Sequence, residues 1–212
     1  MRVIDLGWPI QNGMIVFPGD REPSVELKTT VEADGFRSSM LHTSTHTGTH
    51  MDAPAHMVAD GKFMDELPNE TFFGFAQVID ARACAGRKIE VADIKKSVDD
   101  VRNVDFLLFD TGWNEKWGKE EYLYDFPILS EDAAKWIAAQ QLKGIGFDTI
   151  SIDPVDSMDN PIHKIIFAKN MVVIENLRNL EKVGEKPFCF VALPISLKHQ
   201  DGGPTRAMAV LD

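Results

Sequence analysis

The chain has 212 residues, of which 44% are hydrophobic and 26% charged, and its formal net charge is −11. This length is sufficient for one substantial core, so we expect a single domain over residues 1–212. A strongly acidic chain without a run of Lys or Arg does not favour nucleic acid binding, which depends on basic surface. The sequence contains no apolar stretch of about 18 residues and no signal-like N-terminus, so we expect no membrane span and a cytoplasmic location.

The N-terminal half is predicted to be rich in strands and turns. Apolar or alternating patterns predict strands at residues 2–6, 24–31, 75–80 and 106–110, with a turn at residues 18–20. The 24–31 strand alternates polar and apolar residues, so we expect it to be half-buried.

Helices are predicted mainly in the second half, where they alternate with strands. A short helix is expected at residues 91–96, and a second begins at Ser130, a capping residue, and ends at Gly144. A strand follows at residues 145–148. Asn160 and Pro161 mark the start of a helix over residues 162–168. Strands at residues 171–175 and 188–193 complete a pattern that indicates an α/β fold.

Cys84 and Cys189 lie far apart in ordinary sequence. We interpret them as free thiols in a reducing compartment rather than as a disulfide.

Residues 46–56 concentrate histidine in one run, His46-Thr-Gly-Thr-His50-Met-Asp52-Ala-Pro-Ala-His56, although the whole chain has only 6 histidines. Imidazole and carboxylate ligands together bind a catalytic divalent metal while leaving positions open for water and substrate. We therefore predict a metal site here, and interpret the preceding His42 as structural.

The spacing of this run requires a bend. Alternating threonines and Gly48 disfavour a helix. On a straight strand the ligands would share one face, but four residues span about 13 Å, whereas ligands surround one ion at about 2 Å. We expect a strand that runs into a tight loop, with Gly48 and Pro54 permitting the bend.

Two downstream residues are further candidate ligands. His163 lies in the first turn after Pro161, and Glu175 ends an apolar strand. From the residues alone, each is either a ligand or an ordinary structural or solvated group.

The sequence resembles the cyclase family of metal-dependent hydrolases, whose best-understood branch is bacterial kynurenine formamidase (arylformamidase). Residues 46–56 match the family pattern His-x-Gly-Thr-His-x-Asp-x-Pro-x-His at every fixed position. The likeness extends over nearly the whole chain, through Ile4-Asp-Leu, Phe17-Pro-Gly-Asp20, Leu108-Phe-Asp-Thr-Gly-Trp113, Gly146-Phe-Asp-Thr-Ile-Ser-Ile-Asp-Pro154, His163, Glu175-Asn-Leu177 and Gly203-Pro-Thr-Arg-Ala207.

The resemblance implies a swivelling β/β/α architecture with a mixed or barrel-like sheet and outer helices. It also implies two divalent metal ions, usually Zn²⁺ and in some relatives Mn²⁺. His46, His50 and Asp52 would hold the first ion, with Asp52 bridging, and His163 and Glu175 would complete the second. His56 would carry the proton between water and leaving group.

The implied reaction is hydrolysis of a non-peptide C–N bond in a small aromatic amide, with arylformamidase as the leading activity. Cyclic imides or lactones, including isatin-type rings, are the alternative substrates, and a non-catalytic metal-binding relative is a third possibility that the intact His56 disfavours. Phe17 stands where the formamidase branch typically has a substrate-stacking tryptophan, so we expect it to contact the substrate.

The resemblance and the residues also bear on the oligomeric state, on Trp8 and on the threonines of the run. Family members are commonly homodimers or larger, so we expect a homodimer or homotetramer. Trp8 is either a core residue or part of a substrate wall. Thr47 and Thr49 either orient the histidine rings or are ordinary strand residues.

Overall fold

The computed structural model describes residues 1–98 and 100–211. Its strands are β1 (Arg2–Asp5), β2 (Ser24–Thr29), β3 (Ser38–His42), β4 (His50–Asp52), β5 (Phe73–Asp80), β6 (Phe106–Asp110), β7 (Gly144–Phe147), β8 (Val172–Glu175), β9 (Phe188–Pro194) and β10 (Gly202–Leu211). Its α-helices are α1 (Val31–Asp34), α2 (Val91–Ser97), α3 (Glu131–Ala138) and α4 (Pro161–Phe167).

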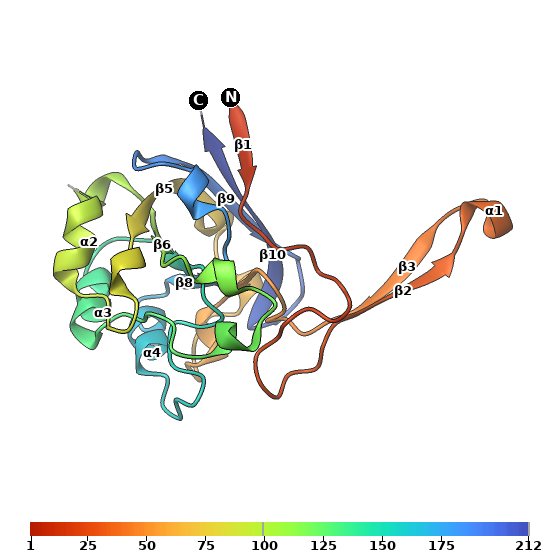
Figure 1. Cartoon of the computed structure of the whole chain (residues 1–212), viewed down its shortest axis with the longest axis horizontal. Helices are drawn as coiled ribbons and strands as arrows, with labels where there is room; N and C mark the ends of the chain where they lie inside the picture. The colour runs from red at the N-terminus through yellow and green to blue at the C-terminus, as the bar shows by residue number, and fades with distance from the viewer. Residues whose placement is uncertain (99, 212) are drawn as a thin grey trace.

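Seven strands form a closed, barrel-like mixed sheet. The order is β10-β4-β8-β7-β6-β5-β9, and β9 pairs again with β10. Strands β5 to β8 run parallel to one another, whereas every pairing that involves β4, β9 or β10 is antiparallel. Strand β1 pairs with the far end of β10, so the two ends of the described chain lie side by side (Figure 1).

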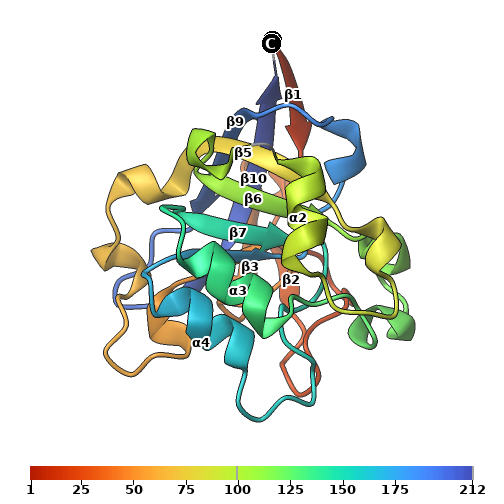
Figure 2. The ribbon, with the colours of Figure 1, turned by 90° about the vertical axis from the view of Figure 1, so that its left-hand side faces the viewer.

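Two hydrophobic cores lie on opposite faces of this sheet. The barrel interior is filled by side chains such as Met51, Phe106 and Phe190. The outer core packs the other faces of β5 to β8 against α2, α3 and α4, which cover one side of the sheet (Figure 2). The alternation of side chains along each strand supplies both cores, and the predicted α/β fold with a barrel-like sheet and outer helices is confirmed.

A hairpin of β2 and β3, closed by α1, projects from the barrel as an arm (Figure 1). The prediction of a half-buried strand over residues 24–31 is therefore wrong in two respects. The strand ends at Thr29, and Val31 begins α1. Residues 24–29 are all intermediate or exposed, because the arm projects away from the barrel and packs on no other layer within the part of the chain that the structure describes (Figure 1).

Most other predicted elements are confirmed within a residue or two, but the helix that begins at Ser130 is shorter than predicted. Ser130 caps it as expected, accepting a hydrogen bond from Ala133 N at 3.2 Å. The helix ends at Ala138, and Gly144 already belongs to β7. A Cβ on Gly144 would lie 2.6 Å from Val172 O, so this glycine serves close strand packing and not helix termination.

Strands β3 and β10 were not predicted. Strand β10 begins with three residues of low strand propensity, Gly202, Gly203 and Pro204. Pairing with three neighbouring strands overrides that local preference. Within residues 1–98 and 100–211, no helix has the length and apolar character needed to cross a bilayer. Cys84 is buried, Cys189 is exposed, and both are free thiols.

Candidate metal centre

The histidine-rich run bends at Gly48, whose φ is +62°, as predicted. The order of elements is the reverse of the prediction, because the bend comes first and the short strand β4 follows. Tertiary pairing places the strand there: His50 is opposite Glu175 of β8, and Asp52 is opposite Gly202 of β10. Two neighbouring strands therefore fix β4 beside the carboxyl end of β8.

Three side chains of the run and one of β8 converge at this point. Asp52 Oδ1 lies 2.7 Å from His46 Nδ1 and 3.2 Å from His50 Nε2. His50 Nε2 is also 3.4 Å from Glu175 Oε2. The other ring nitrogen of His50 donates to the Gly48 carbonyl at 2.8 Å, so its Nε2 faces the carboxylates.

His163 reaches the same cluster from the first turn of α4. Its Nε2 lies 3.2 Å from Glu175 Oε1, and its Nδ1 lies 2.8 Å from Asp153 Oδ2. Asp153 also accepts the backbone N–H groups of Ile162 and His163. Asn160 occupies the predicted N-cap position, but its side chain makes no capping bond. Asp153 therefore both caps the helix and orients the His163 ring.

The arrangement fits a pair of divalent cations. His46, His50 and Asp52 offer ligand atoms that lie within 4.8 Å of one another, and so do Asp52, His163 and Glu175. The second oxygen of Asp52, Oδ2, is buried without a hydrogen-bond partner among the described residues. A buried carboxylate oxygen of this kind is costly unless an ion or donor occupies its free side. The donor set and the unpaired oxygen together indicate a divalent metal site that includes Asp52.

The electrostatics of the cluster couple its imidazoles to its carboxylates. Burial lowers the pKa of His46, but Asp52 and Asp201 more than offset it and raise that pKa to about 9. Burial also lowers the pKa of His163, but Asp153 and Glu175 more than offset this effect and raise that pKa to about 9. Burial raises the pKa of Asp52, yet His50 and His46 hold it well below its usual range. In the metal-free cluster, the protons on the imidazoles thus balance the negative charge of the carboxylates. A bound cation would take the place of these protons.

His56 lies at the edge of the cluster, on a 3-10 helix over Pro54–His56. Its ring centroid is 4.0 Å from that of His46 and 6.2 Å from that of His163. The structure therefore brings all five predicted metal ligands and His56 together.

Two carboxylates that contact these rings were not predicted from the sequence. Asp153 holds His163, and Asp201 Oδ2 lies 2.9 Å from His46 Nε2 and 3.1 Å from His56 Nδ1. Asp153 lies within a quoted family segment, and Asp201 comes two residues before another, at Gly203. An acidic residue within or directly beside such a segment is the signal that could have identified both.

The threonines of the run do not orient the metal-binding rings directly. Thr49 Oγ1 accepts from Trp8 N and donates to Asn176 O. Thr47 Oγ1 is buried without a partner in the described chain. Thr49 thus ties the N-terminal segment to the strand end that carries Glu175. His42 is exposed on the arm, away from the cluster.

Aromatic side chains form a group that is linked to the end of β8 through Tyr122. Phe17 packs against a buried cluster that includes Trp113 and Tyr122. Tyr122 Oη donates at 2.8 Å to Asn176 Oδ1, and Asn176 follows Glu175 directly. Half-buried Trp8 stacks on Trp117 with ring centroids 4.7 Å apart. Phe17 therefore belongs to an aromatic wall that reaches the end of β8, next to Glu175, through Tyr122, and Trp8 stacks at the margin of this wall on Trp117.

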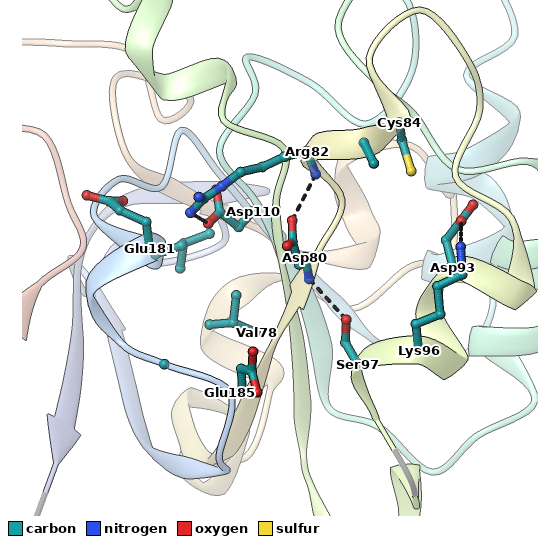
Figure 3. Close-up of a pocket in the computed structure, with 13 residues that line it drawn as sticks. Val78, Asp80, Arg82, Cys84, Asp93, Lys96, Ser97, Asp110, Glu181 and Glu185 are labelled. Carbon is teal, nitrogen blue, oxygen red and sulfur yellow. Dashed lines mark hydrogen bonds and ion pairs between the residues drawn. The ribbon is translucent and has the colours of Figure 1, made fainter.

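A separate hollow of about 560 Å³ lies beside α2 and the ends of β5 and β6 (Figure 3). Both of its basic side chains pair with carboxylates of the lining: Arg82 pairs with Asp110, and Lys96 lies 2.9 Å from Asp93. None of the residues that line it belongs to the histidine cluster.

The sequence matches the model of a known protein family. The model of the Cyclase family, described as "Putative cyclase", matches residues 4–154. The chain therefore belongs to the Cyclase family.

Individual relatives extend this likeness to nearly the whole chain. The protein named kynurenine formamidase from Bacillus cereus is 32% identical over 209 residues, covering 97% of this chain and 95% of that protein. The kynurenine formamidase from Erythrobacter litoralis is 31% identical over 208 residues, covering 98% and 93%.

Solved structures agree with the fold. A structure described as a "Potential Metal-Dependent Hydrolase With Cyclase Activity" is 30% identical with a TM-score of 0.81, covering 98% of this chain and 96% of that one. Isatin hydrolase A from Ralstonia solanacearum superposes with a TM-score of 0.91 at 22% identity, covering 100% and 92%. At that identity the superposition shows a shared fold.

Proposed function

We propose that this protein is a metal-dependent hydrolase that cleaves a non-peptide C–N bond in a small aromatic amide, with arylformamidase as its leading activity. The observation that carries the proposal is the buried cluster centred on Asp52. The second carboxylate oxygen of Asp52 has no hydrogen-bond partner among the described residues and could bind a cation. The relatives named kynurenine formamidase support the choice of bond and substrate.

We propose that two divalent ions bind at the centre. His46, His50 and Asp52 would hold one ion, and Asp52, His163 and Glu175 the other. Three imidazoles favour Zn²⁺, whereas the carboxylates also suit Mn²⁺. When bound, such ions polarise a substrate carbonyl and activate a water molecule.

The remaining work falls to the chain's own side chains. Asp153 and Gly48 O fix the rings of His163 and His50, so that their Nε2 atoms face the centre. His56 has its Nδ1 bound to Asp201, and its Nε2 is the atom available to take a proton from water and pass it to the leaving nitrogen.

Phe17 is proposed to contact the aromatic ring of the substrate, since it belongs to the aromatic wall beside the centre. Phe17→Ala should raise KM more than it lowers kcat, and Phe17→Trp should retain activity. An unchanged KM in Phe17→Ala would exclude this contact. Isatin-type rings are the second candidate substrate, because Phe17 replaces the tryptophan typical of the formamidase branch.

The test is to purify the protein, measure bound metal per chain, and assay N-formylkynurenine, isatin and formanilide with and without a chelator. We expect chelator-sensitive release of formate from N-formylkynurenine. Preferential opening of isatin would favour the second candidate. Stoichiometric metal with no turnover of any substrate would indicate a binding protein.

We also propose a homodimer or homotetramer in the cytoplasm. The arm exposes large apolar side chains that a second copy could cover, namely Leu27, Val31, Phe36, Met40 and Leu41. The free thiols of Cys84 and Cys189 suit a reducing compartment. Light scattering should give at least twice the mass of one chain, and Phe36→Glu should lower it; a monomeric wild type would contradict the assembly.

A further inference from the structure

Asp201 contacts two histidines that have different proposed roles. Its Oδ2 lies 2.9 Å from Nε2 of His46, a metal ligand, and 3.1 Å from Nδ1 of His56, the proton carrier. Its other oxygen accepts a hydrogen bond from Thr45 Oγ1 at 3.3 Å. One carboxylate oxygen therefore holds two rings at once.

The backbone fixes Asp201 in this position. Its carbonyl accepts from Ala53 N at 2.8 Å, and the next residue, Gly202, is opposite Asp52 in the β10–β4 pair. A Cβ at position 202 would lie 2.7 Å from Cε1 of His46. Glycine at this position therefore lets the His46 ring lie directly against β10, within reach of Asp201. The same strand pairing that positions Asp52 thus positions Asp201.

The hydrogen-bond chemistry determines what Asp201 does to each ring. A carboxylate only accepts, so each imidazole must present an N–H to it. His46 then has Nδ1 as its ligand atom, which faces Asp52 at 2.7 Å. His56 then carries its proton on Nδ1, and its Nε2 lone pair is free to accept a proton.

We propose that Asp201 is a positioning residue that fixes the tautomer of a metal ligand and of the proton carrier through one oxygen. The proposal rests on the proposed function for the roles of His46 and His56. It differs from a ligand role, although His46, His56 and Asp201 also lie close enough together to hold an ion.

The test compares Asp201→Asn with wild type and with Asp60→Asn, a matched change at an exposed aspartate. At saturating Zn²⁺ we expect Asp201→Asn to retain its metal, with weaker affinity by about 10- to 100-fold. Its kcat for N-formylkynurenine should fall by roughly 100-fold or more with KM changed by less than about twofold, because an asparagine no longer enforces one tautomer. Asp60→Asn should match wild type, and Asp201→Glu should recover part of kcat.

A second measurement does not depend on turnover. Histidine ¹⁵N spectra of the metal-free and Zn²⁺-loaded proteins, assigned with His56→Gln, should show His56 protonated on Nδ1 in wild type and as a tautomer mixture in Asp201→Asn. Loss of metal at saturating Zn²⁺ would make Asp201 a ligand and overturn the proposal. Unchanged His56 spectra would also overturn it. If wild type hydrolyses no substrate, the proposed function fails, while the spectra still decide the role of Asp201.

Discussion

The histidine cluster and the hollow beside Arg82 both gather several carboxylates, but they balance those charges differently. In the cluster the partners are imidazoles, which can give up their protons, and one oxygen of Asp52 has no hydrogen-bond partner among the residues that the structure describes. In the hollow, Asp110 and Asp93 pair with Arg82 and Lys96, whose positive charges are permanent near neutral pH (Figure 3). Exchangeable protons and an unpaired oxygen, and not the number of acids, therefore mark the cation site.

The largest expected effect comes from removing the shared ligand. Asp52→Asn should lower bound metal per chain and reduce turnover by on the order of 10³-fold or more, because it removes the anion that is proposed to offset two cations. Metal analysis and amide hydrolysis measure the two effects. Unchanged metal stoichiometry would show that Asp52 does not bridge the ions.

Removing the proton carrier should separate chemistry from metal binding. His56→Ala should lower kcat by about 10²- to 10⁴-fold, the usual contribution of general acid–base catalysis, while most metal remains bound. Full activity in this variant would rule out the proposed role of His56.

Metal removal should change how stability depends on pH. The pKa values of His46 and His163 rise from 6.5 to about 9 in the fold. Their stabilisation of the metal-free protein is therefore complete below about pH 6.5 and is lost as the pH rises through about 9. Bound Zn²⁺ requires neutral rings, so the difference in Tm between Zn²⁺-loaded and chelated samples should widen from about pH 6 to about pH 9. Thermal melts measure it, and a difference that narrows with pH would refute this coupling.

The smallest effect is expected in the hollow. Lys96→Ala removes an exposed partner of Asp93, which Arg87 also binds at 2.7 Å. Stability should fall by about 0–1 kcal/mol, and metal content and turnover should not change. A loss of bound metal in this variant would mean that the two charged regions are not independent.

The parts of the site that lie within one short stretch of sequence could be predicted, whereas the parts that depend on strand pairing could not. His46, His50 and Asp52 lie within one short run, so their spacing alone indicated a metal site. Their exact arrangement depends on β4, which has three residues and exists because β8 and β10 pair with it. No local pattern predicts so short a strand.

Long-range contacts account for the remaining differences. Asp201 reaches His46 across 155 residues of sequence, and its role appears only when β10 lies beside β4. Asp153 replaces Asn160 as the cap of α4 because the chain folds back between them. The prediction that the 24–31 strand is half-buried is wrong, because the alternation of polar and apolar residues does not reveal whether another layer covers the strand.

Strand β10 pairs with β1, β4 and β9, and so joins segments from both ends and the first third of the chain. During synthesis the barrel cannot close until β10 has been made, because β10 is the strand that joins β4 to β9. Pairing between residues so distant in sequence is intrinsically slow, so we expect folding in milliseconds to seconds and not in microseconds. Because Asp201 immediately precedes β10, the step that closes the barrel also delivers the carboxylate that orients His46 and His56. A molecule that has not completed its fold therefore also lacks a complete centre.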